Sequence, residues 1–390
     1  MPGRSESLIT SSADLAAACR HLGEAAVFGF DTEFVGEHTF HPELCLIQVG
    51  SPQHLFVIDP LALENVTPFW KVLHDPKHLT IVHAGREEIR LCHLASGTKP
   101  GRVFDVQIAA GLIGLPYPMS HAGLVDNLLG VRLSKAETLT DWRARPLTSR
   151  QIRYAFDDVR HLLQLHERLS TELSNRDRMS WAQEEFDRLA HVATDEQIAL
   201  ERWRKLPGLG KLHGRHLALA RELFAWRQAK AEEIGKPARV VCRDDLLVEL
   251  AKREPNKVAD LQLIRGLSKR DFDGIIATVE RARRLPPDEW PDKQNKEVET
   301  PQMALLVDFL QVVVRQLAEE MAIAPSLFGT VAEFKDLIRH DLYGEPLKPS
   351  TLLGQGWRAQ HIKPRLEEVL RGKKSLRLSR NSRKGPLELH

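Results

Sequence analysis

The chain has 390 residues, more than one ordinary domain needs, so two or three domains are expected. Its composition, 42% hydrophobic and 28% charged, is typical of soluble globular proteins, and no apolar run approaches the roughly 20 residues of a membrane span or the core of a signal peptide. The four cysteines are scattered without a CxxC pair, which disfavours zinc sites and disulfide frameworks and leads us to expect a cytoplasmic protein.

The net charge of +2 conceals an asymmetry along the chain. Residues 1–200 contain 19 Lys and Arg against 26 Asp and Glu, whereas residues 201–390 contain 36 against 27. An acidic half joined to a basic half suits a cation site beside a surface that binds a polyanion, although unrelated domains can also differ in this way.

The first 205 residues alternate between short strands and amphipathic helices, starting with a capped helix at 12–23. Three strands follow and are expected to form a meander. The predicted strands are 26–34, 44–50, 54–59 and 79–82, and the further helices are 65–74, 86–95, 105–114, 121–130 and 148–174. This order predicts an α/β domain with a mixed central sheet over residues 1–205.

The rest of the chain is predicted to be helical. A Gly/Pro cluster at 207–210 marks a boundary, and residues 213–286 and 300–372 each open with a long helix, which suggests a duplicated all-α unit. The predicted helices are 214–234, 243–252, 257–263 and 269–284 in the first unit, and 301–322, 330–340 and 357–371 in the second. A charged linker separates the units, and the basic tail 373–390 is expected to be disordered.

Two carboxylates stand near the end of the apolar run Phe28–Phe34. Because side chains alternate along a strand, Asp31 and Glu33 point to the same face. Neighbouring acids repel each other by roughly a few kcal/mol at low dielectric unless a cation lies between them or one of them holds a proton. The alternative is an exposed pair at the end of a strand.

A second acidic element follows the strand at 79–82. This strand runs into His83-Ala84-Gly85, so the first turn of the next helix lies at the carboxyl edge of the sheet, where α/β sites usually form. Glu88, on that turn, can reach toward Asp31 and Glu33. Acids there can also serve only to complement the helix dipole.

A third element is the helical segment 153–159. Tyr154 and Asp158 are four residues apart and share a helix face, and a phenol there is suited to orient or deprotonate a water. Asp157, three residues from Tyr154, is a competing carboxylate that spacing alone leaves open.

Four carboxylates, Asp31, Glu33, Glu88 and Asp158, without a cysteine or histidine cluster favour Mg²⁺ or Mn²⁺ over zinc. Two such ions, roughly 3.5–4 Å apart, support in-line attack on a phosphodiester. One ion makes the attacking water a better nucleophile, and the other stabilises the leaving 3′ oxygen.

The order Asp-Thr-Glu, His-Ala-Gly-x-x-acid, Tyr-x-x-x-Asp resembles the tyrosine-bearing branch of the DEDD exonuclease superfamily. The likeness to the ribonuclease D family is closer and covers about residues 8–200. It is carried by the blocks 31–35, 44–50, 105–110 and 139–147, which end shortly before Tyr154.

The helical region also carries a resemblance. Residues 213–286 resemble the HRDC domain of RecQ-type helicases and ribonuclease D, through Arg221–Arg227 and 237–241. Residues 300–372 look like the second, more divergent copy that ribonuclease D has.

The resemblance implies a ribonuclease H-like 3′→5′ exoribonuclease domain that trims stable RNA precursors, tRNA above all. Carried over, Asp31, Glu33 and Asp158 are metal ligands and Tyr154 positions the attacking water. The family pattern selects Asp158 over Asp157. One departure is Glu88, where the family most often has Asp. Glu is a competent Mg²⁺ ligand, so activity is expected.

Within the second motif, Glu87 is the alternative ligand to Glu88 if the helix is rotated. The expected partner is RNA with a free 3′ end, bound through phosphate contacts by exposed basic residues. Candidates are Lys205, Lys211, Arg215, Lys269, Arg270 and the basic tail. A monomer without a membrane or an obligate protein partner is expected. Two alternatives stay open: an exonuclease acting mainly on single-stranded DNA, and an RNA-binding scaffold with weakened catalysis.

Overall fold

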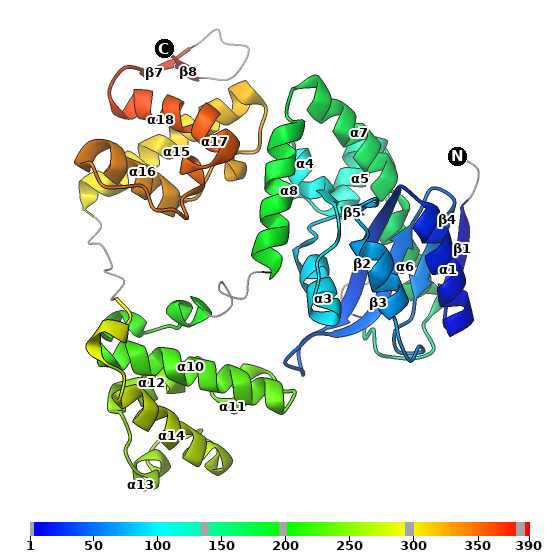
Figure 1. Cartoon of the computed structure of the whole chain (residues 1–390). Helices are drawn as coiled ribbons and strands as arrows, with labels where there is room; N and C mark the ends of the chain where they lie inside the picture. The colour runs from blue at the N-terminus through cyan, green and yellow to red at the C-terminus, as the bar shows by residue number, and fades with distance from the viewer. Residues whose placement is uncertain (1–3, 134–139, 195–200, 293–299, 380–386) are drawn as a thin grey trace. The chain divides into compact units, whose positions relative to one another are not determined.

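The computed structural model describes residues 4–133, 140–194, 201–292, 300–379 and 387–390 (Figure 1). Its internal contacts divide the chain into two compact units. The first unit comprises residues 1–32, 46–194 and 299–390, and the second comprises residues 33–45 and 195–298. Most of the sheet and the C-terminal helices therefore belong to one unit, and the middle helices belong to the other together with residues 33–45. Within the described ranges, no helix combines the length and apolar character needed to cross a membrane.

A mixed sheet organises the N-terminal domain, as the sequence predicts, and it has six strands in the order β1-β4-β3-β2-β5-β6. β5 is parallel to β2 and β6, β1 is parallel to β4, and β3 is antiparallel to β4. The strands are β1 Ser5–Ile9, β2 Val27–Val35, β3 Glu43–Gly50, β4 His54–Ile58, β5 Leu79–Val82 and β6 Val103–Asp105. β1 and β6 lie outside the predicted strands because one has weak apolar alternation and the other only three residues.

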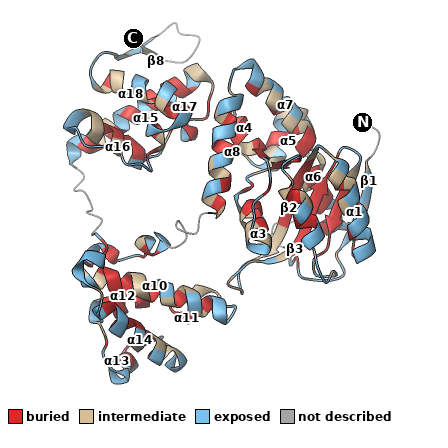
Figure 2. Ribbon diagram, in the orientation of Figure 1, coloured by how far each residue is buried: buried red, intermediate tan, exposed pale blue. Residues whose placement is uncertain are grey.

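Helices pack on the sheet, whose strands are largely buried (Figure 2). They are α1 Ser12–Glu24, α2 Thr67–His74, α3 Arg86–Ser96, α4 Val106–Leu112, α5 His121–Leu129, α6 Ser149–Arg160, α7 Leu162–Asn175 and α8 Met179–Thr194. The helix expected over 148–174 is divided at His161 into α6 and α7. The two sides of this bend pack on sheet glycines: Val159 approaches Gly50, and Leu162 approaches Gly29.

The two faces of β2 have different neighbours. Phe30 packs against α2, with its ring centroid 5.8 Å from Phe69 and 6.4 Å from Trp70. A Cβ atom on Gly29 would lie 2.9 Å from the Leu162 side chain, so the opposite face of β2 packs against α7. Because faces alternate along a strand, Asp31 points to the α6–α7 side with Gly29.

The C-terminal helical domain contains α15 Pro301–Met321, α16 Val331–Tyr343, α17 Gly356–His361 and α18 Lys363–Leu370. The tail differs from the expectation of disorder: β7 Leu376–Leu378 and β8 Leu387–Leu389 pair antiparallel, with Leu376 opposite Leu389. The alternating leucines of both strands explain this pairing. Arg380, Arg383 and Lys384 of the tail lie outside the described residues.

This C-terminal domain is joined to α8 by a buried ion pair. Glu185, 1% exposed, binds the Arg358 guanidinium, which is 4% exposed, and accepts a 3.0 Å hydrogen bond from Trp357 Nε1. Trp357 stacks on Trp181 of α8 with ring centroids 5.0 Å apart. Burial raises the pKa of Glu185, but the Arg358 and Arg188 charges outweigh it, so the pKa is lowered and the carboxyl stays ionised.

The second unit is all-helical, with α10 Arg215–Glu233, α11 Ala238–Val241, α12 Asp244–Arg253, α13 Val258–Gln262 and α14 Phe272–Arg283. Its core gathers leucines and aromatic residues of α10, α12 and α14, with Leu223, Leu247 and Ile275 fully buried. Residues 33–45 belong to this unit because Phe40 N donates to Gly235 O (3.3 Å) and His41 pairs with Glu232 (3.2 Å).

The ion pair on α8 generates a stability prediction. Glu185→Leu is expected to lower the free energy of unfolding by roughly 3–5 kcal/mol, because the Arg358 guanidinium stays buried without its counter-charge. The double variant Glu185→Leu with Arg358→Met removes both charges, so its free energy of unfolding is expected to fall clearly less. Urea unfolding measures both. Equal losses for the single and double variants would contradict this account, and Glu172→Gln, in an exposed pair with Arg176, is the control with little effect.

Candidate active site

Strand β2 presents the first two acids of the predicted site. Asp31 and Glu33 are both half-buried and, being two residues apart, share one face of the strand. The Thr32 N–H donates to Asp31 Oδ1 (2.9 Å), which fixes one oxygen of this carboxyl.

A tight turn delivers the third acid. In His83-Ala84-Gly85, Ala84 has a φ of 55° and accepts a 2.8 Å hydrogen bond from Arg86 N. A Cβ atom on Gly85 would lie 2.3 Å from Val82 Cγ2, so only glycine is tolerated there. The turn therefore starts α3 directly at the end of β5, and Glu88 lies on its first turn.

Asp105 holds this turn in place from the end of β6. Its carboxylate, 1% exposed, accepts hydrogen bonds from Gly85 N (2.9 Å), Gln107 N (2.8 Å) and Ile108 N (3.1 Å). One buried acid thus caps α4 and anchors the turn that precedes α3. In the sequence, Asp105 belongs only to a block of family likeness, although an Asp before an apolar helical run is a capping signal.

The structure brings Glu88 to Asp31. Glu88 is 8% exposed, and its carboxyl hydrogen-bonds to the Asp31 side chain. Burial raises the pKa of Asp31 to about 7, and burial together with the Asp31 charge raises the pKa of Glu88 well above its usual value. Glu87 points elsewhere, because it pairs with Arg90 at 2.9 Å and is 45% exposed. Of the two glutamates, Glu88 is therefore the neighbour of Asp31.

Helix α6 supplies Tyr154 and Asp158. A capping box between Thr148 and Gln151 fixes its start. Asp157 is engaged by Arg160 at 2.8 Å, and Arg160 also pairs with Glu6 of β1 at 2.7 Å. Asp157 is thus directed to β1, whereas Asp158, which is half-buried like Asp157, is the acid next to Val159, the residue that packs on the sheet.

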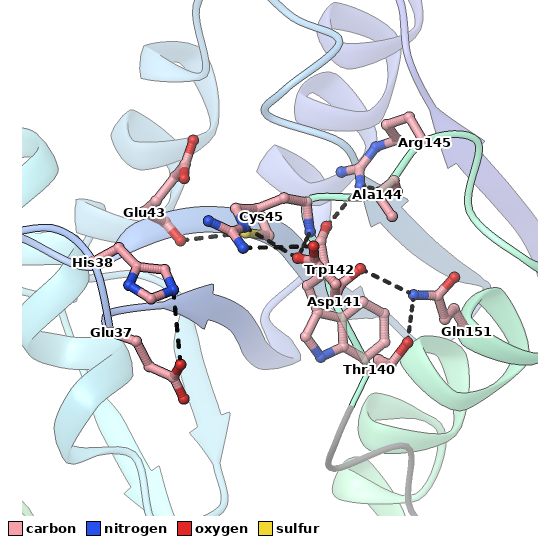
Figure 3. Close-up of polar contacts among 11 residues, drawn as sticks. Glu37, His38, Glu43, Cys45, Thr140, Asp141, Trp142, Ala144, Arg145 and Gln151 are labelled. Carbon is pink, nitrogen blue, oxygen red and sulfur yellow. Dashed lines mark hydrogen bonds and ion pairs between the residues drawn. The ribbon is translucent and has the colours of Figure 1, made fainter.

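The loop before α6 places an aromatic ring beside Tyr154. Trp142 is 5% exposed, and its ring centroid lies 5.9 Å from that of Tyr154. Arg145 holds the loop: Nη1 donates to Trp142 O (2.7 Å) and Ala144 O (2.9 Å), as Figure 3 shows. Its other nitrogens bind the buried Asp59 carboxylate at 2.6 and 2.7 Å. In the sequence, Trp142 and Arg145 stand out only as members of the block of family likeness at 139–147.

The acidic side chains of the site are oxygen donors of the kind that Mg²⁺ and Mn²⁺ prefer. Among the residues described by the structure, no three Asp, Glu, His or Cys side chains stand close enough to hold a metal ion. Asp31 and Glu88 nevertheless have the chemistry of such a site, since two carboxyls in contact, one of them buried, are disfavoured when both are ionised. A divalent cation between oxygen donors relieves that repulsion without a proton.

Comparisons with known proteins decide the family. Residues 7–174 match a 3′-5′ exonuclease family model, and residues 216–277 match an HRDC domain model. Ribonuclease D of Pseudomonas paraeruginosa is 33% identical over 359 residues, which cover 91% of this chain and 94% of the relative. The chain belongs to the ribonuclease D family. Ribonuclease D of Bartonella henselae is 31% identical over a stretch that covers 95% of this chain and 92% of that relative.

The fold agrees with this family. The crystal structure of Escherichia coli RNase D has a TM-score of 0.82 and 28% identity, covering 94% of this chain and 99% of that chain. The protein is therefore a 3′→5′ exoribonuclease, and the predicted family, fold class and enzyme class are confirmed. RNA is its class of substrate, as expected for a ribonuclease D.

The paired carboxyls predict a pH dependence of the stability of this exoribonuclease. Without metal, folded Asp31 keeps its proton up to about pH 7, whereas an unfolded Asp loses it near pH 4. The folded state then binds more protons between these pH values, so the free energy of unfolding falls as the pH rises from about 4 to 7, by on the order of 1–3 kcal/mol. Thermal unfolding in EDTA across this pH range measures the change in the free energy of unfolding.

Asp31→Asn is expected to flatten this pH dependence, and saturating Mn²⁺ is expected to do the same in the parent protein, because a cation replaces the proton. Glu87→Gln, next to the pair but bound to Arg90, is the matched control and should retain most of the slope. A parent protein whose metal-free stability rises over this pH range would contradict the assignment.

Proposed function

We propose that this ribonuclease hydrolyses RNA 3′ ends with two divalent ions, Mg²⁺ or Mn²⁺, held by Asp31, Glu33, Glu88 and Asp158. The observation that carries the proposal is the buried contact between Asp31 and Glu88, which is unfavourable for two anions and favourable around a cation. Such ions, when bound, polarise the scissile phosphodiester and lower the pKa of the attacking water.

Individual side chains have distinct roles in the proposed mechanism, as metal ligands or as the group that orients the water. Asp31, fixed by the Thr32 N–H, and Glu88, placed by the Asp105-anchored turn, supply oxygen ligands from two neighbouring parts of the sheet edge. Asp158 supplies a ligand from α6. Tyr154, one helical turn before Asp158 and packed beside Trp142, orients the water for in-line attack.

We further infer that the substrates are structured RNAs with 3′ extensions, tRNA precursors in particular. The Escherichia coli relative is an exoribonuclease involved in structured RNA processing, which supports this inference. Lys205, Lys211, Lys269 and Arg270 are exposed and suited to bind phosphates, whereas Arg215 is held by Glu254 at 2.7 Å. All proposed site residues come from one chain, so a monomer suffices.

Neighbouring acids provide the sharpest test of this site. Glu88→Gln and Asp158→Asn are each expected to slow mononucleotide release from a 3′-extended tRNA by roughly 10²–10⁴-fold, since losing a metal ligand removes several kcal/mol of transition-state stabilisation. RNA binding, measured by filter retention in EDTA, should survive because the phosphate contacts lie elsewhere.

The matched controls are the adjacent acids that bind arginines. Glu87→Gln and Asp157→Asn break only the pairs with Arg90 and Arg160 and should stay within a few-fold of the parent rate. Comparable losses for Glu87→Gln and Glu88→Gln, or full activity of Glu88→Gln, would contradict the proposed ligand set.

A further inference from the structure

One buried polar side chain next to the site has no role in the mechanism above. Gln48, in β3, is 0% exposed, and among the described residues neither its Nε2 nor its Oε1 has a hydrogen-bond partner. A buried amide with both groups unsatisfied is costly, and an apolar side chain of the same shape would be cheaper. Such a residue in the middle of a strand calls for a functional explanation.

Two glycines show which way Gln48 points. A Cβ atom on Gly50 would lie 2.8 Å from Val159 O, and one on Gly29 would lie 2.9 Å from Leu162 Cβ. Both glycines therefore face the bend between α6 and α7. Since side chains alternate along a strand, Gln48, two residues before Gly50, shares this face, as does Asp31, two residues after Gly29.

The same contacts place Gln48 and Asp31 at one level of the sheet. β2 and β3 are neighbours joined by a short connection, so they run antiparallel. Gly29 and Gly50 abut the two sides of one bend, Leu162 at the start of α7 and Val159 near the end of α6, which indicates similar levels along their strands. Moving two residues forward in β2 and two residues back in β3 leads in the same direction, so Gln48 and Asp31 occupy matching positions on neighbouring strands and share one face.

We propose that Gln48 is a positioning residue for the metal-binding carboxylates: its amide donates to Asp31 when that carboxylate holds a cation. The inference rests on the proposed metal site. Asp31 Oδ1 already accepts from Thr32 N, and a donor on the next strand would fix the plane of the carboxylate. A neutral amide orients the carboxylate without competing with the cation for it. A lysine or arginine would compete, because its positive charge pairs with the carboxylate. Partners behind metal ligands commonly tune affinity in this way.

The chain offers a matched control on the opposite face. Thr80 of β5 is also 0% exposed with an unsatisfied Oγ1. It pairs with Phe28, which is one residue before Gly29 and therefore points away from α6 and α7. Thr80→Val thus removes a comparable buried hydroxyl without a hydrogen-bond partner from the same sheet. It leaves unchanged the face of the sheet that carries Asp31 and Gln48.

Calorimetric titration with Mn²⁺ and thermal unfolding in EDTA test the proposal. Gln48→Met keeps the side-chain shape and should melt at or above the parent temperature without metal, because two unsatisfied groups are gone. Its Mn²⁺ affinity should fall by roughly 10–100-fold, with higher Mn²⁺ restoring the rate. Thr80→Val should leave the Mn²⁺ affinity unchanged. Gln48→Leu repeats the test if the Met variant does not fold.

Two outcomes would overturn the inference: Mn²⁺ affinity at the parent value in a folded Gln48 variant, or an equal loss in Thr80→Val. Asp31→Asn, titrated in parallel, separates this failure from failure of the metal site. If Asp31→Asn loses Mn²⁺ while Gln48→Met retains it, only the role of Gln48 is wrong. If Asp31→Asn binds Mn²⁺ like the parent, the metal site itself is wrong.

Discussion

The repulsion between the half-buried carboxyl of Asp31 and the buried carboxyl of Glu88 is the constraint on which the rest of the proposed site depends. Their hydrogen bond persists without metal only because one of them keeps a proton near neutral pH. A fold gains nothing in stability from such a pair, since burying acids without a cation is unfavourable. This agrees with the proposed cation site, in which a proton takes the place of the cations when they are absent.

The surrounding structure holds that unfavourable arrangement in place. Asp105 fixes the turn before α3 with three backbone hydrogen bonds, and Gly85 allows the chain to turn directly after β5. Gly29 and Gly50 let α6 and α7 approach the sheet more closely than any side chain would permit. These supporting contacts on several sides hold the acids close together.

Much of this was predictable from the sequence, for reasons that differ between residues. Period-two alternation puts Asp31 and Glu33 on one face, and the Gly-containing turn puts Glu88 at the sheet edge. Spacing alone leaves open the choice between Glu87 and Glu88 and that between Asp157 and Asp158, although the family pattern favours Asp158. The contacts with Arg90 and Arg160 show that Glu87 and Asp157 are engaged elsewhere. The bend at His161, the role of Asp105 and the burial of Gln48 were not predictable, because each depends on packing between segments far apart in the chain.

The central claim is that Asp31 and Glu88 form part of a cation site, and a crystal structure after soaking in Mn²⁺ tests it most directly. Anomalous scattering locates manganese independently of the carboxylate positions. The account predicts manganese bound by oxygens of both Asp31 and Glu88, with Glu87 still paired to Arg90. Manganese bound by Glu87 in place of Glu88, or no manganese at Asp31 under conditions in which the enzyme degrades RNA, would contradict it.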